Sequence, residues 1–148
     1  MIDSFFFDFD GTLQGFENHE ISDSTIEALK LLKQKNKKIY IATGRNMADM
    51  PKHIFDYGFD GYINNNGGMC SDENRQSFFV DYINPNDIEA LLQYDDENPF
   101  SFSYMTKEAF SINRVNENVE KSFAYFGMEL PEVVDPVSYT HLRAHETG

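Results

Sequence analysis

Residues 2–13 read Ile-Asp-Ser-Phe-Phe-Phe-Asp-Phe-Asp-Gly-Thr-Leu, and the architecture of the chain can be worked out from them. The run from Ile2 to Asp8 is short and apolar, which is typical of a strand covered on both faces and therefore of a parallel sheet. Two carboxylates, Asp8 and Asp10, end the run, and Gly11 lets the chain turn away. Ligands of such sheets bind beyond the carboxyl ends of the strands, so we expect a site here.

Strand and helix patterns alternate after this motif. The periodicity predicts a helix from a cap at Ser22 or Ser24 to about Asn36, then a strand over 38–43, a helix over 46–57 and a strand over 61–65. This alternation builds a parallel sheet through crossover connections.

The pattern changes after residue 66. It predicts a β-hairpin over 67–83, a helix over 85–95, paired strands over 100–106 and 109–114, and a helix over 116–126. We therefore expect an α/β fold, with a Rossmann-like parallel sheet followed by a smaller α+β subdomain. Residues 137–148 continue neither pattern and look like a non-native tail.

Charge and composition exclude several functions. The 148 residues include 12 Lys and Arg against 25 Asp and Glu, a formal charge of -13, so we expect no nucleic-acid partner. No apolar run reaches the roughly 20 residues of a membrane-spanning helix, so we expect no membrane partner. Cys70 is the single cysteine, which agrees with a reducing compartment, and we expect a cytoplasmic protein. The sequence leaves the oligomeric state open.

A second motif, Ala42-Thr43-Gly44-Arg45, ends the second predicted strand. A hydroxyl, a glycine and free main-chain N–H groups at a helix start form an anion site. Asp8 and Asp10 repel each other unless a cation lies between them, and oxygen ligands at short spacing suit Mg²⁺. The alternative is a turn in which the acidic residues merely end a strand.

Together these motifs resemble the haloacid dehalogenase-like phosphatase superfamily. Residues 63–68, Ile-Asn-Asn-Asn-Gly-Gly, with the hairpin and the Ile83-Asn84-Pro85 helix start, are similar to its Cof-type, class IIB branch, in which a cap follows the third strand. The resemblance implies the N-terminal half of the core over 1–65 and part of a class IIB cap over 66–136, followed by the tail over 137–148.

The resemblance also implies roles for single residues. Asp8 matches the nucleophile, which also binds Mg²⁺, and Asp10 matches the acid/base residue, whose main-chain carbonyl faces the metal. Further contacts to phosphate or substrate are expected from residues in the two motifs and the segment leading into the cap: Phe9, Gly11, Thr12, Thr43, Gly44, Arg45 and Asn66.

The expected function is a Mg²⁺-dependent phosphatase of small phosphorylated metabolites, sugar phosphates or similar, that works through an aspartyl-phosphate. The family's third-motif lysine and its fourth-motif acidic cluster are not found in these residues. We therefore expect an N-terminal fragment with weak or absent turnover. The alternative is a non-enzymatic phospho-acceptor or phosphate-binding module, similar to a signalling receiver domain.

Overall fold

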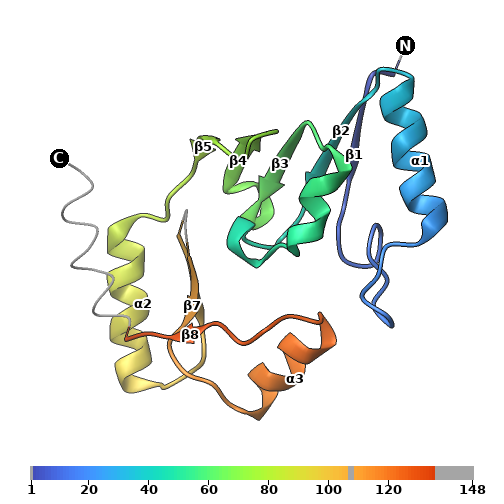
Figure 1. Cartoon of the computed structure of the whole chain (residues 1–148). Coiled ribbons are helices and arrows are strands. Elements are labelled where there is room, and N and C mark those ends of the chain that lie inside the picture. The colour runs from blue at the N-terminus through green and yellow to red at the C-terminus, as the bar shows by residue number, and fades with distance from the viewer. Residues whose placement is uncertain (1, 107–108, 136–148) are drawn as a thin grey trace.

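Five strands form the main sheet of the computed structural model, which describes residues 2–106 and 109–135. They lie in chain order: β1 (Ser4–Phe7), β2 (Lys38–Ala42), β3 (Gly61–Asn64), β4 (Met69–Asp72) and β5 (Ser77–Val80). The first three are parallel, as the alternating pattern predicts, and β4 and β5 continue the sheet as an antiparallel hairpin. The predicted hairpin is thus part of the main sheet (Figure 1), and the division of the chain at residues 65 and 66 stays a prediction.

Helix α1 (Asp23–Gln34) connects β1 to β2 and packs against one face of the sheet. Its N-cap is Ser22, whose side chain accepts a hydrogen bond from the Thr25 main-chain N–H, so one of the two predicted caps is confirmed. Ile39 and Ile41 of β2 point to the covered face and are fully buried. This face therefore holds the core under the helix.

The expectation that β1 is covered on both faces is wrong for the described residues. The ring of Phe6 stacks on Tyr40 of β2 at 4.8 Å, yet Phe6 remains 59% exposed. β1 is an edge strand of this sheet, and the described helix that packs beside it covers only the opposite face. The apolar run correctly indicated a strand, but not which elements would lie against it.

The predicted helix over 46–57 is also wrong. Two short 3-10 helices replace it, η1 (Met47–Asp49) and η2 (Lys52–Tyr57). Pro51 separates them because proline has no N–H to donate and forces the preceding residue out of the helical region. Met50 accordingly has an extended backbone, with φ -76° and ψ 135°.

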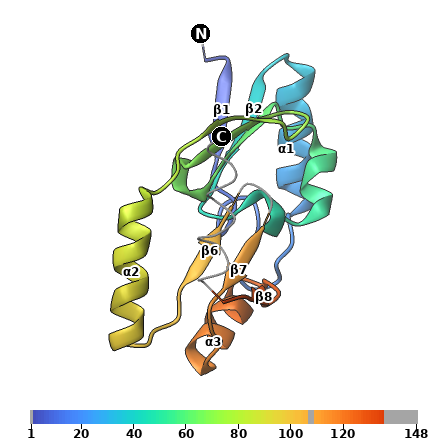
Figure 2. The same ribbon diagram turned by 90° about the vertical axis from the view of Figure 1, so that its left-hand side faces the viewer.

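Residues 85–133 form a second part of the fold, called here the second layer, which contains a small sheet and two helices (Figure 2). Its elements are α2 (Pro85–Glu97), β6 (Ser103–Met105), β7 (Phe110–Ile112), α3 (Glu117–Tyr125) and β8 (Glu132–Val133). β6 and β7 are antiparallel as predicted, and β8, which the pattern did not indicate, pairs parallel to β7. Both helices lie where they were predicted, and Asn84 and Asn116 cap their first turns.

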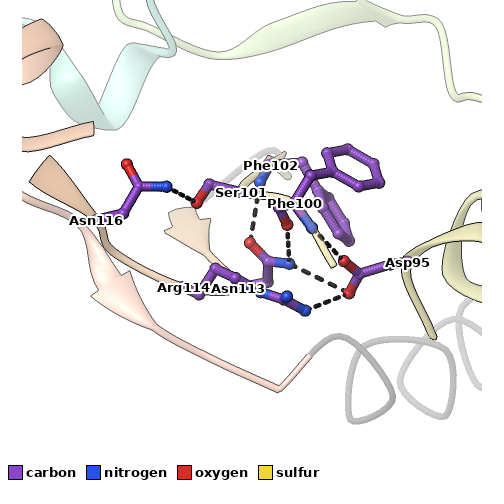
Figure 3. A network of polar contacts seen from close by, with 7 residues as sticks. All are labelled: Asp95, Phe100, Ser101, Phe102, Asn113, Arg114 and Asn116. Carbon is purple, nitrogen blue, oxygen red and sulfur yellow. Dashed lines mark hydrogen bonds and ion pairs between the residues drawn. The ribbon is translucent and has the colours of Figure 1, made fainter. Parts of the chain in front are cut away.

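A polar network holds α2 to this small sheet (Figure 3). Asp95, which is 5% exposed, accepts hydrogen bonds from the Phe100 main-chain N–H at 2.9 Å and from Arg114 at 2.6 Å. The Asn113 side chain bonds to the main chain of Phe100 and Phe102 at 3.0 and 2.9 Å. Buried polar groups that are satisfied in this way fix the geometry of the layer.

Candidate active site

The loop after β1 places two carboxylates on one side of the chain. Phe9 lies between them and is fully buried, which anchors the loop in the core. Its main-chain carbonyl accepts hydrogen bonds from three successive amides, those of Thr12, Leu13 and Gln14, at 3.3, 3.0 and 3.0 Å. Because residues 8 and 10 alternate with Phe9, their side chains are turned to the opposite side, toward a cavity that both of them line.

The end of this loop requires a glycine, Gly11, for two reasons. Its φ of +78° is a left-handed conformation that glycine adopts readily, and its N–H donates to the Gln14 carbonyl at 2.7 Å. A Cβ at this position would lie 2.3 Å from the ring of Phe16. Phe16 in turn stacks on Tyr125 at the end of α3, so the loop touches the second layer directly.

The loop after β2 brings the second motif to the same place. Thr43 is buried, and its hydroxyl accepts a hydrogen bond from the Arg45 main-chain N–H at 3.1 Å. Gly44 lies against Asn66, whose side-chain oxygen would be 3.0 Å from a Cβ on the glycine. Asn66 itself is exposed and has φ +53°, ψ +35° in the short helix η3 (Asn65–Gly67).

Arg45 connects the two loops and the second layer. Its Nε and Nη2 donate to the two carboxylate oxygens of Asp10 at 2.8 and 2.7 Å. Nη2 also donates to the Phe126 carbonyl at 2.9 Å, and Nη1 donates to the Asp49 carbonyl at 3.3 Å. The guanidinium lies 5.0 Å from the ring centroid of Phe9. All three nitrogens of the guanidinium therefore donate to protein acceptors, and its face lies against an aromatic ring.

These loops and the second layer line one open cavity of about 460 Å³. Of the residues predicted from sequence, its wall contains Asp8, Asp10, Thr43, Gly44 and Arg45. The wall does not include Phe9, Gly11, Thr12 or Asn66, so any contact of theirs with a ligand stays a prediction. Sequence reasoning missed the remaining wall residues, which are Phe16, Asn46, Asp49, Met105, Phe110, Ser122, Phe123, Phe126 and Met128.

Asn46 and Asp49 could have been suspected because they follow the Thr-Gly-Arg motif directly. Asn46 caps η1 and donates from its side chain to the Thr106 carbonyl at 2.9 Å, which joins the two layers. The second-layer residues carry no such signal, because all of them except Ser122 are ordinary apolar residues that only the fold places on the cavity. Burial raises the pKa of Asp49 from 3.8 to about 6, with Asp10 adding to the effect and Arg45 opposing it.

A divalent cation fits part of this donor set. The carboxylate of Asp8 is exposed on the cavity, and no hydrogen bond to it is found within residues 2–106 and 109–135. Both carboxylate oxygens of Asp10 accept hydrogen bonds from Arg45, so the group of Asp10 that could bind a metal is its main-chain carbonyl. The described residues contain no cluster of three or more acidic, His or Cys side chains suited to a metal, so an ion here would take its remaining ligands from elsewhere.

The fold and the cavity define the class of protein. It is an α/β protein with a cavity at the carboxyl ends of adjacent parallel strands, which acidic side chains and the Thr43-Gly44 loop line and which a second layer covers. Residues 5–141 match the model of the haloacid dehalogenase-like hydrolase family, and the chain belongs to this family. The resemblance found in the sequence is thereby confirmed. Within the described residues, each helix is too short or too polar to cross a membrane.

Particular relatives agree with this assignment. The chain is 25% identical over 131 residues to an HMP-PP phosphatase of Klebsiella pneumoniae (strain 342), covering 88% of this chain and 47% of that protein. It is similar to a structure from work on a trigonal-bipyramidal intermediate in a phosphoryl-transfer superfamily, at TM-score 0.86 and 29% identity, covering 95% of this chain and 55% of the other.

A second solved structure supports the predicted branch of the family. The HAD subclass IIB sugar phosphatase BT4131 matches at TM-score 0.82 and 28% identity, with 94% of this chain and 55% of that chain covered. The present chain thus spans about half the length of the relatives it matches.

Proposed function

We propose that these residues form the N-terminal part of a Mg²⁺-dependent phosphatase of small phosphorylated metabolites, such as sugar phosphates. The observation that carries the proposal is the convergence of Asp8, Asp10, Thr43 and Gly44 on one covered cavity. The names of the HMP-PP phosphatase and the sugar phosphatase support it, since both relatives are phosphatases of this family. We place the protein in the cytoplasm.

The proposed reaction has two steps. An oxygen of Asp8 attacks phosphorus and the bond to the leaving oxygen breaks, while Asp10, protonated and released from its ion pair with Arg45, gives that oxygen a proton. Water then attacks the phosphorus of the aspartyl-phosphate, Asp10 takes a proton from it, and the bond to Asp8 breaks. The Thr43 hydroxyl and the Gly44 N–H donate to the phosphoryl oxygens, which carry the negative charge throughout.

Mg²⁺, held by the Asp8 carboxylate and the Asp10 carbonyl, would neutralise charge on the phosphoryl group. The remaining ligands and a cation for the phosphate would come from the part of the protein that the relatives possess beyond this match. We therefore propose that residues 1–148 alone turn over weakly or not at all.

The test is phosphate release by the full-length protein with MgCl₂ and p-nitrophenyl phosphate. Asp8→Asn removes the nucleophile, and we expect at least about a thousandfold loss of kcat. Asp3→Asn is the matched control, because Asp3 is an exposed acid at the other end of the same strand, and it should retain the wild-type rate. An Asp8→Asn protein that releases phosphate at the wild-type rate contradicts the proposal. A long-lived aspartyl-phosphate without release supports the phospho-acceptor alternative.

A further inference from the structure

The far wall of the cavity differs chemically from the end that holds Asp8 and Thr43. The second layer contributes mainly apolar side chains to it, from β6, β7, α3 and the residues after α3: Met105, Phe110, Phe123, Phe126 and Met128. Phe110 and Phe123 stack on each other at 5.8 Å. This wall offers the carbon skeleton of a leaving group an apolar surface to pack on.

Two polar residues of the first layer, Asn46 and Asp49, also line the cavity. Asn46 is already occupied, because its side-chain oxygen accepts from the Ala48 N–H at 2.9 Å and its amide donates to the Thr106 carbonyl. Asp49, at the end of η1, uses its main-chain carbonyl for Arg45. Among residues 2–106 and 109–135, no hydrogen bond or ion pair reaches the Asp49 carboxylate. It is half-buried and lines the cavity.

We propose that Asp49 selects the leaving group, and that the preferred substrates are phosphate esters whose leaving group carries a cationic amine. The inference rests on the proposed phosphatase function and adds the substrate class. An ammonium group beside Asp49 would satisfy the carboxylate's free acceptors with a charge-assisted hydrogen bond, while the carbon skeleton packs on the apolar wall. A neutral group of the same shape gives the half-buried carboxylate no charge-assisted hydrogen bond.

Glucosamine 6-phosphate and glucose 6-phosphate form a suitable pair of probes, because they differ only in an amino group replacing a hydroxyl. We expect the full-length wild-type protein to prefer the amino sugar in kcat/KM by about tenfold. Asp49→Asn should remove most of this preference, whereas Asp49→Glu, which keeps the charge, should retain part of it. Asp56→Asn is the control: Asp56 is an exposed acid in the neighbouring η2 and is not part of the cavity wall, so the ratio should not change.

Each outcome decides the question. The role of Asp49 is overturned if the wild-type protein shows no preference for the amino sugar. It is also overturned if Asp49→Asn leaves the ratio of the two kcat/KM values unchanged, or if Asp56→Asn changes that ratio equally. In each case the phosphatase assignment stays intact. Hydrolysis of p-nitrophenyl phosphate, which has no amine, tests the phosphatase assignment separately, and its complete absence in the wild-type protein overturns both. If Asp49→Asn does not fold, as judged by circular dichroism, the ratio is measured with Asp49→Ser.

Discussion

Arg45→Met probes the ion pair that joins the two motifs. Methionine keeps an apolar stem but removes every donor, so Asp10 loses both hydrogen bonds and the carbonyls of Phe126 and Asp49 lose one each. The two charged side chains are 6% and 17% exposed. Removing one partner of a buried pair costs about 3–5 kcal/mol. Because Asp10 keeps some contact with water, we expect about 2–3 kcal/mol of lost unfolding free energy.

The assay is urea unfolding of the chain followed by far-ultraviolet circular dichroism. A double-mutant cycle with Asp10→Asn isolates the pair, and we expect a coupling free energy of about 1–2 kcal/mol. Lys121→Met is the control, since the pair between Lys121 and Glu117 is 69% and 79% exposed. This substitution should cost less than about 0.5 kcal/mol.

Two results would refute the reasoning: an additive cycle, or an Arg45→Met protein no less stable than Lys121→Met. If Arg45→Met is already unfolded without urea, Arg45→Lys gives the answer. Lysine keeps the charge but cannot form the two parallel hydrogen bonds to Asp10, so we expect a loss of about 1 kcal/mol.

Three further predictions concern the loops around the site and the base of the sheet. Gly11→Ala should lower the free energy of unfolding in urea by about 2 kcal/mol. Gly67→Ala is the control and should cost about 1 kcal/mol, because Gly67 has φ +97° but open space around it. Equal losses would show that contact with Phe16 is unimportant. Asn46→Ala removes the hydrogen bond to Thr106 and the cap of η1, and should cost about 1–2 kcal/mol; an unchanged urea midpoint would contradict this. Burial acts to raise the pKa of Asp60, but hydrogen bonds from Lys38, the Ile39 N–H and Lys33 outweigh it and lower the pKa to about 2. This depressed pKa stabilises the folded chain above about pH 4, and the stabilisation is lost as the pH falls toward 2. Asp60→Asn should therefore lower the free energy of unfolding by about 1 kcal/mol at pH 6, and the difference from the wild-type chain should shrink below pH 4. A difference that does not depend on pH would contradict this.

Local signals explain what could be predicted from the sequence. An apolar run, a cap residue such as Ser22, and glycines after strand ends act within a few positions of the chain. Strand–helix alternation then implies parallel neighbours, which places the carboxyl ends of β1 and β2 side by side. The grouping of Asp8 and Thr43 on one cavity follows from these local rules.

The rest of the cavity depends on contacts between distant segments. Asn46 meets Thr106 and Arg45 meets Phe126 across 60 and 81 positions of the chain, and no periodicity predicts such pairs. Which apolar side chains are buried also depends on contacts between distant segments. Phe78 is 73% exposed, although its apolar character predicts a core position, because β5 packs mainly against its neighbour β4 and the adjacent Phe79, on the other face, is exposed as well.

The pairing of Arg45 with Asp10 also changes the electrostatic argument for a metal. From the sequence, two carboxylates one residue apart imply an intervening cation, because like charges in a shared site repel. The structure supplies such a cation within the protein, since the guanidinium of Arg45 holds the Asp10 carboxylate and rests on the ring of Phe9 between the two acids. Repulsion between the two side chains therefore does not by itself require Mg²⁺. The case for the metal rests instead on Asp8, whose carboxylate is exposed on the cavity without a described partner and is free to bind both a cation and phosphorus.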